Sequence, residues 1–160
     1  MSNDAERDST GGRSEEPGAA DLSKVRFVTG CEHMDTDWIQ RELSQKSYWA
    51  EGRTREQVRT IMSTSYCFGA FLGERQIAYA RVLTDLVTIA YLADVWIDEE
   101  FRGRGIGRRF IAHVLSDERF AGVRKWLLVT RDAHTFYAPL GFKPLAYPER
   151  YMEMVERESW

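Results

Sequence analysis

The chain has 160 residues, a formal net charge of −3 and 43% hydrophobic residues. A chain of this length is expected to form one domain with a buried core. Neither a basic stripe for nucleic-acid backbones nor an apolar segment long enough to span a bilayer is present, so neither nucleic acid nor membrane is expected as a partner. Residues 1–20 are mainly polar and small, with five acidic and two basic residues, which predicts a disordered tail before a single domain at 21–160.

The two cysteines, Cys31 and Cys67, lack C-x-x-C spacing. This pattern indicates two reduced thiols. No second ligand pair supports Cys31, Glu32 and His33 as a metal site, so no metal is expected. The polar N-terminus has no apolar signal segment, and a cytoplasmic location is expected.

The first half of the chain predicts a strand, two helices and a hairpin. A helix that begins near residue 35 would bury one apolar side. Thr54 and Gln57 have the spacing of a capping box, which predicts the start of the second helix. The expected strands are at 25–28, 66–71 and 76–82, and the last two form the hairpin.

The second half predicts a buried strand, a glycine-rich loop and a helix, in that order. Apolar residues that recur every four positions, at Ile106, Phe110 and Val114, predict the helix after the loop. Asp132 is expected to cap a later short helix, and Gly141 to end it. The expected strands are at 88–97, 125–130 and 151–155, and the short helix is at 133–140.

The loop before the long helix is suited to bind an anion. Gly103, Gly105 and Gly107 remove the Cβ atoms that would keep a ligand from the main chain, and they permit positive φ. The first amides of a helix have no acceptor within it and carry the positive end of its dipole, so they can hold a phosphate. Arg102 and Arg104 add charged, forked donors. The other interpretation is a surface turn with solvated arginines, and the spacing R-x-x-G-x-G matches neither common nucleotide motif.

Two motifs resemble the GNAT (Gcn5-related) N-acetyltransferases. R-x-x-G-x-G at 102–107 is similar to the acetyl-CoA pyrophosphate loop of that family, and F-Y-x-x-x-G-F at 136–142 is similar to its second signature. The resemblance covers about residues 25–155. It implies the α/β (α+β) GNAT fold, with a mixed, mostly antiparallel sheet of about six or seven strands and about four helices. It also implies a sheet splayed between its fourth and fifth strands to admit acetyl-CoA (coenzyme A).

The resemblance further implies residues for the cofactor and for the chemistry. The pantetheine arm is expected to pair with the fourth strand, where the Val95 amide would polarise the thioester carbonyl. Tyr137 matches the tyrosine acid of the family, and a phenol with an ordinary pKa near 10 can protonate the departing thiolate. Without the resemblance, Tyr137 would be a packing aromatic. The expected cofactor-binding residues are Val95, Trp96, Ile97, Arg102, Gly103, Arg104, Gly105, Ile106, Gly107, Arg108 and Tyr137.

The general base is left open between Asp94 and His134. Polyamine acetyltransferases carry Y-L-E-D in the fourth strand, but this chain has Ala93 at the glutamate position. Alternation along a strand is expected to send Ala93 and Asp94 to opposite faces. Asp94 could hold the ammonium, accept its proton through water, or be a buried structural carboxylate. His134 could relay a proton or face solvent, and Glu32 and Glu42 are lesser candidates.

The expected function is acetylation of a primary amine, of a small molecule or peptide, by direct transfer from acetyl-CoA in a ternary complex. The alternative is a catalytically silent acyl-CoA sensor or interaction module, motivated by Ala93. A homodimer is a further option. Aromatic walls would bind apolar groups or cations of the acceptor. Residues expected to contact it are Trp38, Tyr48, Trp49, Asp94 and Tyr151.

Overall fold

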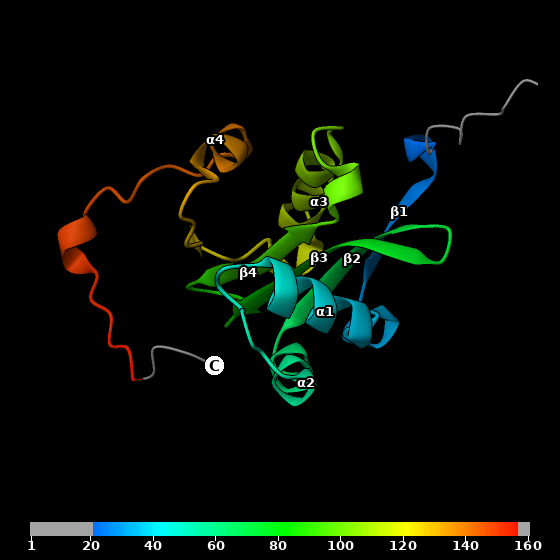
Figure 1. Ribbon diagram of the computed structural model, residues 1–160. Helices are drawn as coiled ribbons and strands as arrows, with labels where there is room; N and C mark the ends of the chain where they lie inside the picture. Colours follow the sequence, from blue (N-terminus) through cyan, green and yellow to red (C-terminus); the bar gives the residue numbers. More distant parts are fainter. Residues whose placement is uncertain (1–20, 157–160) are drawn as a thin grey trace, which may run out of the picture.

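The computed structural model of the protein describes residues 21–156. Within this range the strands form one five-stranded sheet in the order β1-β2-β3-β4-β5, with helices on both faces (Figure 1). The strands are β1 (Val25–Thr29), β2 (Tyr66–Leu72), β3 (Arg75–Thr84), β4 (Ala90–Ile97) and β5 (Trp126–Leu127). The helices are α1 (Thr36–Lys46), α2 (Arg55–Ser63), α3 (Ile106–Leu115) and α4 (His134–Tyr137).

Side chains at the helix starts explain where α1 and α2 begin. The carboxylate of Asp35 accepts a hydrogen bond from the Trp38 amide at 2.9 Å. Thr54 and Gln57 form the predicted capping box, in which each side chain bonds to the main chain of the other residue. These bonds satisfy amides that have no partner within the helix. The two predicted helices are confirmed.

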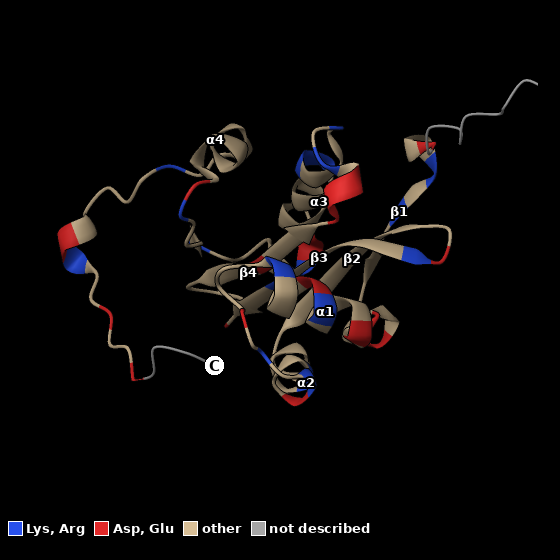
Figure 2. Cartoon of the chain, in the orientation of Figure 1, with Lys and Arg blue, Asp and Glu red and all other residues tan. Residues whose placement is uncertain are grey.

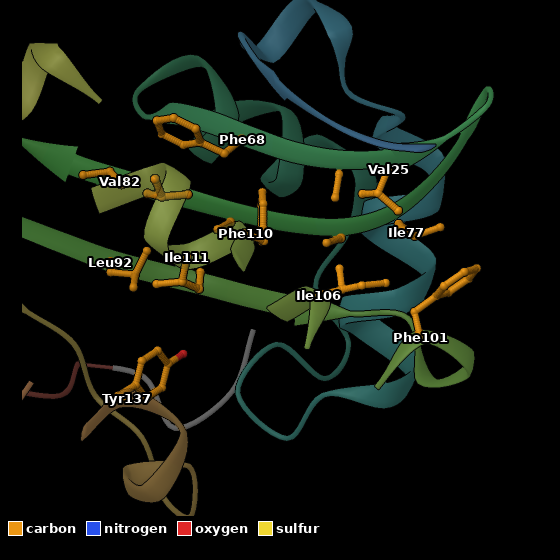
Figure 3. Close-up of a cluster of buried hydrophobic side chains, with 14 of the residues drawn as sticks. Val25, Phe68, Ile77, Val82, Leu92, Phe101, Ile106, Phe110, Ile111 and Tyr137 are labelled. Atoms are coloured by element: carbon orange, nitrogen blue, oxygen red, sulfur yellow. The ribbon is translucent and has the colours of Figure 1, made fainter. Parts of the chain in front are cut away.

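The sheet separates two hydrophobic cores. On one face α1 and α2 pack against β3 and β4, with Leu43, Val58 and Trp96 buried between them. On the other face α3 packs its apolar side, including Phe110 and Ile111, against all the long strands (Figure 3). The apolar repeat of α3 predicted this packing, because residues four apart lie on one side of a helix.

Strands β4 and β5 pair only at their beginnings. The parallel pairing joins Ala90 to Trp126 and Tyr91 to Leu127, whereas β4 continues to Ile97. The chain after β5 therefore leaves the sheet while β4 runs on. The other neighbouring strands are antiparallel. The predicted mixed sheet with a splay between its fourth and fifth strands is confirmed, as are the four helices.

The C-terminal strand predicted at 151–155 is wrong, and with it the expected six or seven strands. The described residues form five strands, and the chain after α4 runs away from the sheet (Figure 1). Met152 and Met154 are 98% and 83% exposed. A segment with alternating apolar residues forms a strand only where the edge of a sheet is available to pair with it, because strand preference depends on contacts with neighbouring strands. For the same reason β5 has two residues instead of six.

The short helix predicted at 133–140 is divided. α4 ends at Tyr137, and a 3₁₀ turn follows at Ala138–Leu140. Pro139 has no amide to donate, which interrupts the α-helical bonds. Gly141 ends the segment at φ +97°, as predicted. The prediction that Asp132 caps α4 is wrong, because the N-cap is Ala133 and no side chain caps the helix.

Cys31 and Cys67 are joined in a disulfide, so the prediction of two reduced thiols is wrong. The antiparallel pairing of β1 with β2 brings residue 31 beside residue 67, with the Cα atoms 5.0 Å apart. A separation of 36 residues conceals this contact in the sequence. The cysteines therefore no longer support the expected cytoplasmic location.

Candidate functional site

A cleft with a volume of about 990 Å³ lies where β4 and β5 part. Its first wall, the glycine half, is formed by the end of β4, the loop before α3 and the end of α4. Its second wall, the arginine half, is formed by the chain after α1, by β3 and by the middle of β4. The glycine half comprises Val95, Ile97, Arg102, Gly103, Gly105, Gly107, Arg108, Phe136 and Tyr137. The arginine half comprises Lys46, Ser47, Tyr48, Trp49, Arg53, Arg81, Tyr91, Ala93 and Asp94.

The three glycines of the loop do two different things. Gly103 and Gly105 have φ of +70° and +80°, and a Cβ atom on either would meet nothing within 4 Å. A Cβ on Gly107 would lie 3.2 Å from the Phe136 ring and 3.3 Å from Ile97. Gly103 and Gly105 thus leave open space beside the main chain, whereas Gly107 lets α3 approach α4 and β4. Of the three glycines, Gly103 and Gly105 have the open space that the predicted ligand site requires.

The start of α3 favours an anion. Gly105 is its N-terminal cap and offers no side-chain acceptor, and the first turn contains no acidic residue. The first amides are therefore not capped by a side chain, and the helix dipole places positive charge there. Of the other predicted loop residues, Arg102 and Arg108 line the cleft. The Ile106 side chain is core, at 1% exposed, and Arg104 does not line the cleft.

Arg102 is oriented by β4. Its Nε donates to the carbonyl of Ile97 at 2.9 Å, and its guanidinium lies 4.4 Å from the centre of the Trp96 ring. Stacking of a guanidinium on an indole fixes its plane. The arginine therefore lies at the mouth of the glycine half with a defined orientation.

A bulge interrupts β4 at the centre of the cleft. Arg81 lies opposite Ala93 and Tyr79 opposite Trp96, so Asp94 and Val95 together face one residue of β3. Asp94 has φ +51°, which is uncommon outside glycine. The extra residue reverses the alternation, so Ala93 and Asp94 share the face of α1 and α2. The expectation that they lie on opposite faces is wrong.

Asp94 is fixed by two arginines. Its Oδ2 accepts from Arg53 Nη1 at 2.8 Å and from Arg81 Nε at 2.6 Å. The side chains are almost fully buried, at 3% exposed for Arg53 and Asp94 and 11% for Arg81. An oxygen that already accepts two charged hydrogen bonds is less available to take a proton from a ligand. Sequence reasoning missed both arginines, although a charged residue within the apolar strand β3 is a signal for Arg81.

Tyr137 lies in the cleft beside the core of α3 (Figure 3). Its side chain packs against Phe136 and Phe142, with ring centres 4.9 and 5.7 Å away. Burial, together with the nearby Tyr48, raises the pKa of Tyr137 to about 12. The phenol therefore keeps its proton at neutral pH and well above it, as a proton donor requires.

The other predicted proton acceptors lie outside the cleft. His134 is exposed, and neither it nor Glu32 or Glu42 lines the cleft. Glu42 is buried in α1 and accepts from Lys46 Nζ at 2.8 Å. The structure thus brings Asp94 and Tyr137 together and leaves His134 apart.

Of the residues predicted to contact the acetyl acceptor, some line the cleft and others do not. Tyr48 and Trp49 line the arginine half. The Tyr48 hydroxyl accepts from the Arg131 amide at 3.0 Å, and the Arg131 guanidinium lies 3.8 Å from the Tyr48 ring centre. Trp38 is core at 6% exposed. Tyr151 lines a separate cavity of about 760 Å³ beside β5. The expectation that Trp38 and Tyr151 line this cleft is wrong.

Two further findings concern other classes of site. Among residues 21–156, no group of three or more histidine, cysteine, aspartate or glutamate side chains could hold a metal ion. No helix in that same range has the length and apolarity to cross a membrane.

Comparisons with known proteins point to one family. The model of the acetyltransferase (GNAT) domain matches residues 63–144. A GNAT-family protein from Xanthomonas campestris pv. campestris has a structure with a TM-score of 0.79 and 38% sequence identity, covering 82% of this chain and 92% of that one. A Gibberella zeae protein named as an acetyltransferase is 27% identical over 132 residues, or 69% of this chain and 74% of that protein.

A structure from Clostridium acetobutylicum, described as an acetyltransferase with acetyl-CoA, has a TM-score of 0.64. Its sequence identity is 14%, and the match covers 82% of this chain and 96% of that one. At this identity the similarity is one of fold alone. The two solved structures thus share the fold of this chain.

Proposed function

Because the chain belongs to the GNAT acetyltransferase family, we propose that it transfers the acetyl group of acetyl-CoA to a primary amine by direct transfer in a ternary complex. One observation carries this proposal. A single cleft contains an open glycine loop, the bulged part of β4 and the buried phenol of Tyr137. Acetyl transfer needs an anion site, a donor to the carbonyl oxygen and a proton source, and these three features are suited to those roles.

The glycine half fits coenzyme A. Open space beside Gly103 and Gly105, next to the uncapped start of α3, suits a pyrophosphate. The edge of β4 beyond Tyr91 is not paired with β5 in the described structure, so its main chain can pair with an extended amide-bearing arm. Arg102 and Arg108 add positive charge. When bound there, acetyl-CoA supplies the acetyl group as a thioester.

The centre of the cleft would carry out the transfer. The amine nitrogen bonds to the acetyl carbon, the carbon–sulfur bond breaks, and Tyr137 gives its proton to the thiolate sulfur. The main-chain amide of Val95, at the bulge, would stabilise the developing negative charge on the carbonyl oxygen. The phenol of Tyr137 is restored from water after the product leaves.

The proton of the substrate ammonium is proposed to leave through water next to Asp94. Oδ2 of this carboxylate is occupied by Arg53 and Arg81, which supports a route through water over direct transfer to the side chain. His134 lies outside the cleft. Asp94 is therefore the better supported of the two predicted bases.

Direct transfer is supported by the absence of an activated nucleophile among the described residues that line the cleft. Neither cysteine lines the cleft, and the two are joined to each other. The hydroxyl of Ser47 donates to the carbonyl of Leu43 at 2.7 Å and is buried. Among the described residues, no activated thiol or hydroxyl stands where it could carry the acetyl group.

A two-part experiment tests the proposal. Acetyl-CoA is first expected to raise the melting temperature, because a ligand that binds only the folded state stabilises it. Release of free thiol from acetyl-CoA is then followed across simple amines, amino acids, polyamines and peptides with free N-termini. Acceptor-dependent thiol release is expected for one class. A thermal shift with no acceptor-dependent release would favour the alternative of a silent acyl-CoA sensor.

A further inference from the structure

The arginine half of the cleft contains two buried arginines, Arg53 and Arg81, that have no part in the transfer reaction proposed above. Charged residues gather on the helices and loops, and the strands are mainly uncharged (Figure 2). Against this background Arg81 of β3 and Asp94 of β4 meet Arg53 on one face of the sheet. All three line the cleft. Their position is next to the bulge at which the acetyl group would be transferred.

The cluster has two cations and one anion. A single carboxylate oxygen of Asp94 accepts from both guanidiniums, so these three side chains carry a formal charge of +1. Removing charges from water is costly unless opposite charges and hydrogen bonds compensate. Of the two arginines, Arg81 is the more exposed and is the one that a negative group of a ligand can reach.

The geometry of Arg81 leaves it suited to receive such a group. Its Nε donates to Asp94 and its Nη1 to the Ser65 hydroxyl at 3.2 Å. A guanidinium has five N–H donors in a planar fork, so this arginine has donors beyond those two bonds. Such a fork matches the two oxygens of a carboxylate or phosphate.

The neighbouring cations are less suited to that role. Lys46 bonds to Glu42 at 2.8 Å, and Arg131 bonds to Asp132 at 3.2 Å. Glu42 also pairs with Arg41. The side chains of Lys46, Arg41, Arg131 and Asp132 are between 40% and 66% exposed. Exposed pairs contribute little to binding because water and salt screen them. The buried arginine cluster is therefore the positive feature of this half.

We propose that the acetyl acceptor is an amine that also bears a carboxylate or phosphate, and that Arg81, with Arg53, binds this negative group. The inference rests on the proposed acetyltransferase function and names the class of its acceptor. The negative group lies against the arginines, and the amine is then directed toward the bulge at Val95. Polyamines and lysine-rich peptides are disfavoured, because the cluster repels polycations.

Matched acceptors test the proposal on the wild-type protein. Glycine is compared with glycinamide, phenylalanine with phenylalaninamide, and O-phosphoethanolamine with ethanolamine. In each pair the amine is retained and the negative charge is removed. In at least one pair the anionic member is expected to have a kcat/KM about tenfold or more higher, as charged hydrogen bonds typically give. The pair that responds identifies carboxylate or phosphate as the group bound.

Variants then assign the effect to the cluster. Arg81→Gln is expected to raise KM for the anionic member about tenfold and to change KM for the neutral member little, while Arg81→Lys retains part of the preference. Arg150→Gln is the matched control, since this arginine is exposed and pairs with Glu149 outside the cleft. Melting temperatures with acetyl-CoA show that each variant is folded and binds the cofactor.

The outcomes separate the two proposals. Equal or better kcat/KM for the neutral member of every pair would overturn the anionic acceptor and leave the acetyltransferase intact. An equal loss for both members in Arg81→Gln would also overturn it and assign the cluster to holding the bulge. No acetylation of any amine would reject the acetyltransferase proposal itself.

Discussion

The two halves of the cleft differ in what they present to a ligand, which is main chain in one half and charged side chains in the other. The glycine half presents main chain, with open space at Gly103 and Gly105 and the uncapped start of α3. The arginine half presents buried side chains, with Asp94 fixed by Arg53 and Arg81. A main-chain site is suited to the pyrophosphate, which every coenzyme A molecule carries whatever the acceptor. A side-chain site can be changed by single substitutions, so specificity for the acceptor is expected to lie in the arginine half.

The two halves meet at the bulge of β4. One extra residue turns Asp94 toward the arginines and places Val95 toward α3. The left-handed backbone of Asp94 costs energy that surrounding contacts must offset. Bonds from Arg53 and Arg81 fix the position of its side chain. The carboxylate of Asp94 is thus the negative charge between two buried cations.

Replacing that charge should have the largest effect on stability. Asp94→Asn retains the shape and tolerates left-handed φ, but it leaves two buried guanidiniums without their carboxylate. The free energy of unfolding is expected to fall by roughly 3–5 kcal/mol. Asp132→Asn is the control, because the exposed pair with Arg131 should contribute less than about 1 kcal/mol. Urea denaturation measures the free energy of unfolding of both variants. Similar losses in the two variants would show that the buried cluster stabilises the fold no more than an exposed ion pair does.

Tyr137→Phe should have the largest effect on turnover without unfolding the protein. The ring still packs against Phe136 and Phe142, so acetyl-CoA should stabilise the variant as it does the wild type. Loss of the proton donor is expected to lower kcat about a hundredfold or more. Steady-state kinetics with thermal shifts separate the two effects. A wild-type kcat would make Tyr137 a packing residue.

Gly105→Val tests the glycine half by itself. A side chain there would fill the space proposed for the pyrophosphate, and affinity for acetyl-CoA should fall about tenfold or more. Gly73→Val is a matched control, since Gly73 also has positive φ and open space but lies in the turn between β2 and β3. Both variants should lose roughly 1–3 kcal/mol of stability from backbone strain. Calorimetric titration with coenzyme A should distinguish them, and equal affinities would contradict the assignment.

The pH dependence should show a smaller but diagnostic effect. Burial raises the pKa of Tyr137 to about 12, so the proton donor is retained where an ordinary tyrosine, with a pKa near 10, is half ionised. We expect kcat to stay level up to about pH 10. The same shift predicts a stability contribution that is complete below about pH 10 and is lost as pH rises through the folded pKa. A kcat that halves by about pH 10 would place Tyr137 in an ordinary environment.

His134→Gln should have the smallest effect. His134 is exposed and does not line the cleft, so kcat/KM and its pH profile should change less than about twofold. Loss of the low-pH limb in this variant would return His134 to the role of base.

The sequence could predict the loop of the glycine half because the residues of that loop are contiguous. R-x-x-G-x-G at 102–107 lies within one turn, and main-chain binding depends on little else. The arginine half joins Arg53 to Asp94 across 41 residues, and no local pattern indicates that contact. The bulge also reversed the alternation on which the faces of Ala93 and Asp94 were predicted.

Long-range pairing explains the other differences. The strand predicted at 151–155 has the required alternation but no partner in the described fold. Cys31 and Cys67 have no motif spacing, yet the pairing of β1 with β2 joins them. Capping boxes and apolar repeats were predicted correctly because their contacts lie within four residues.

The central claim is direct transfer of the acetyl group to an amine in this cleft, with Tyr137 as the proton donor. It is tested most directly by mass spectrometry of a reaction that contains isotopically labelled acetyl-CoA and an acceptor found in the thiol-release screen. The label is expected on the amine nitrogen of the acceptor and not on the protein, with formation of the product suppressed in Tyr137→Phe. Label found on a protein side chain that then passes to the acceptor, or label recovered only as acetate, would contradict the account.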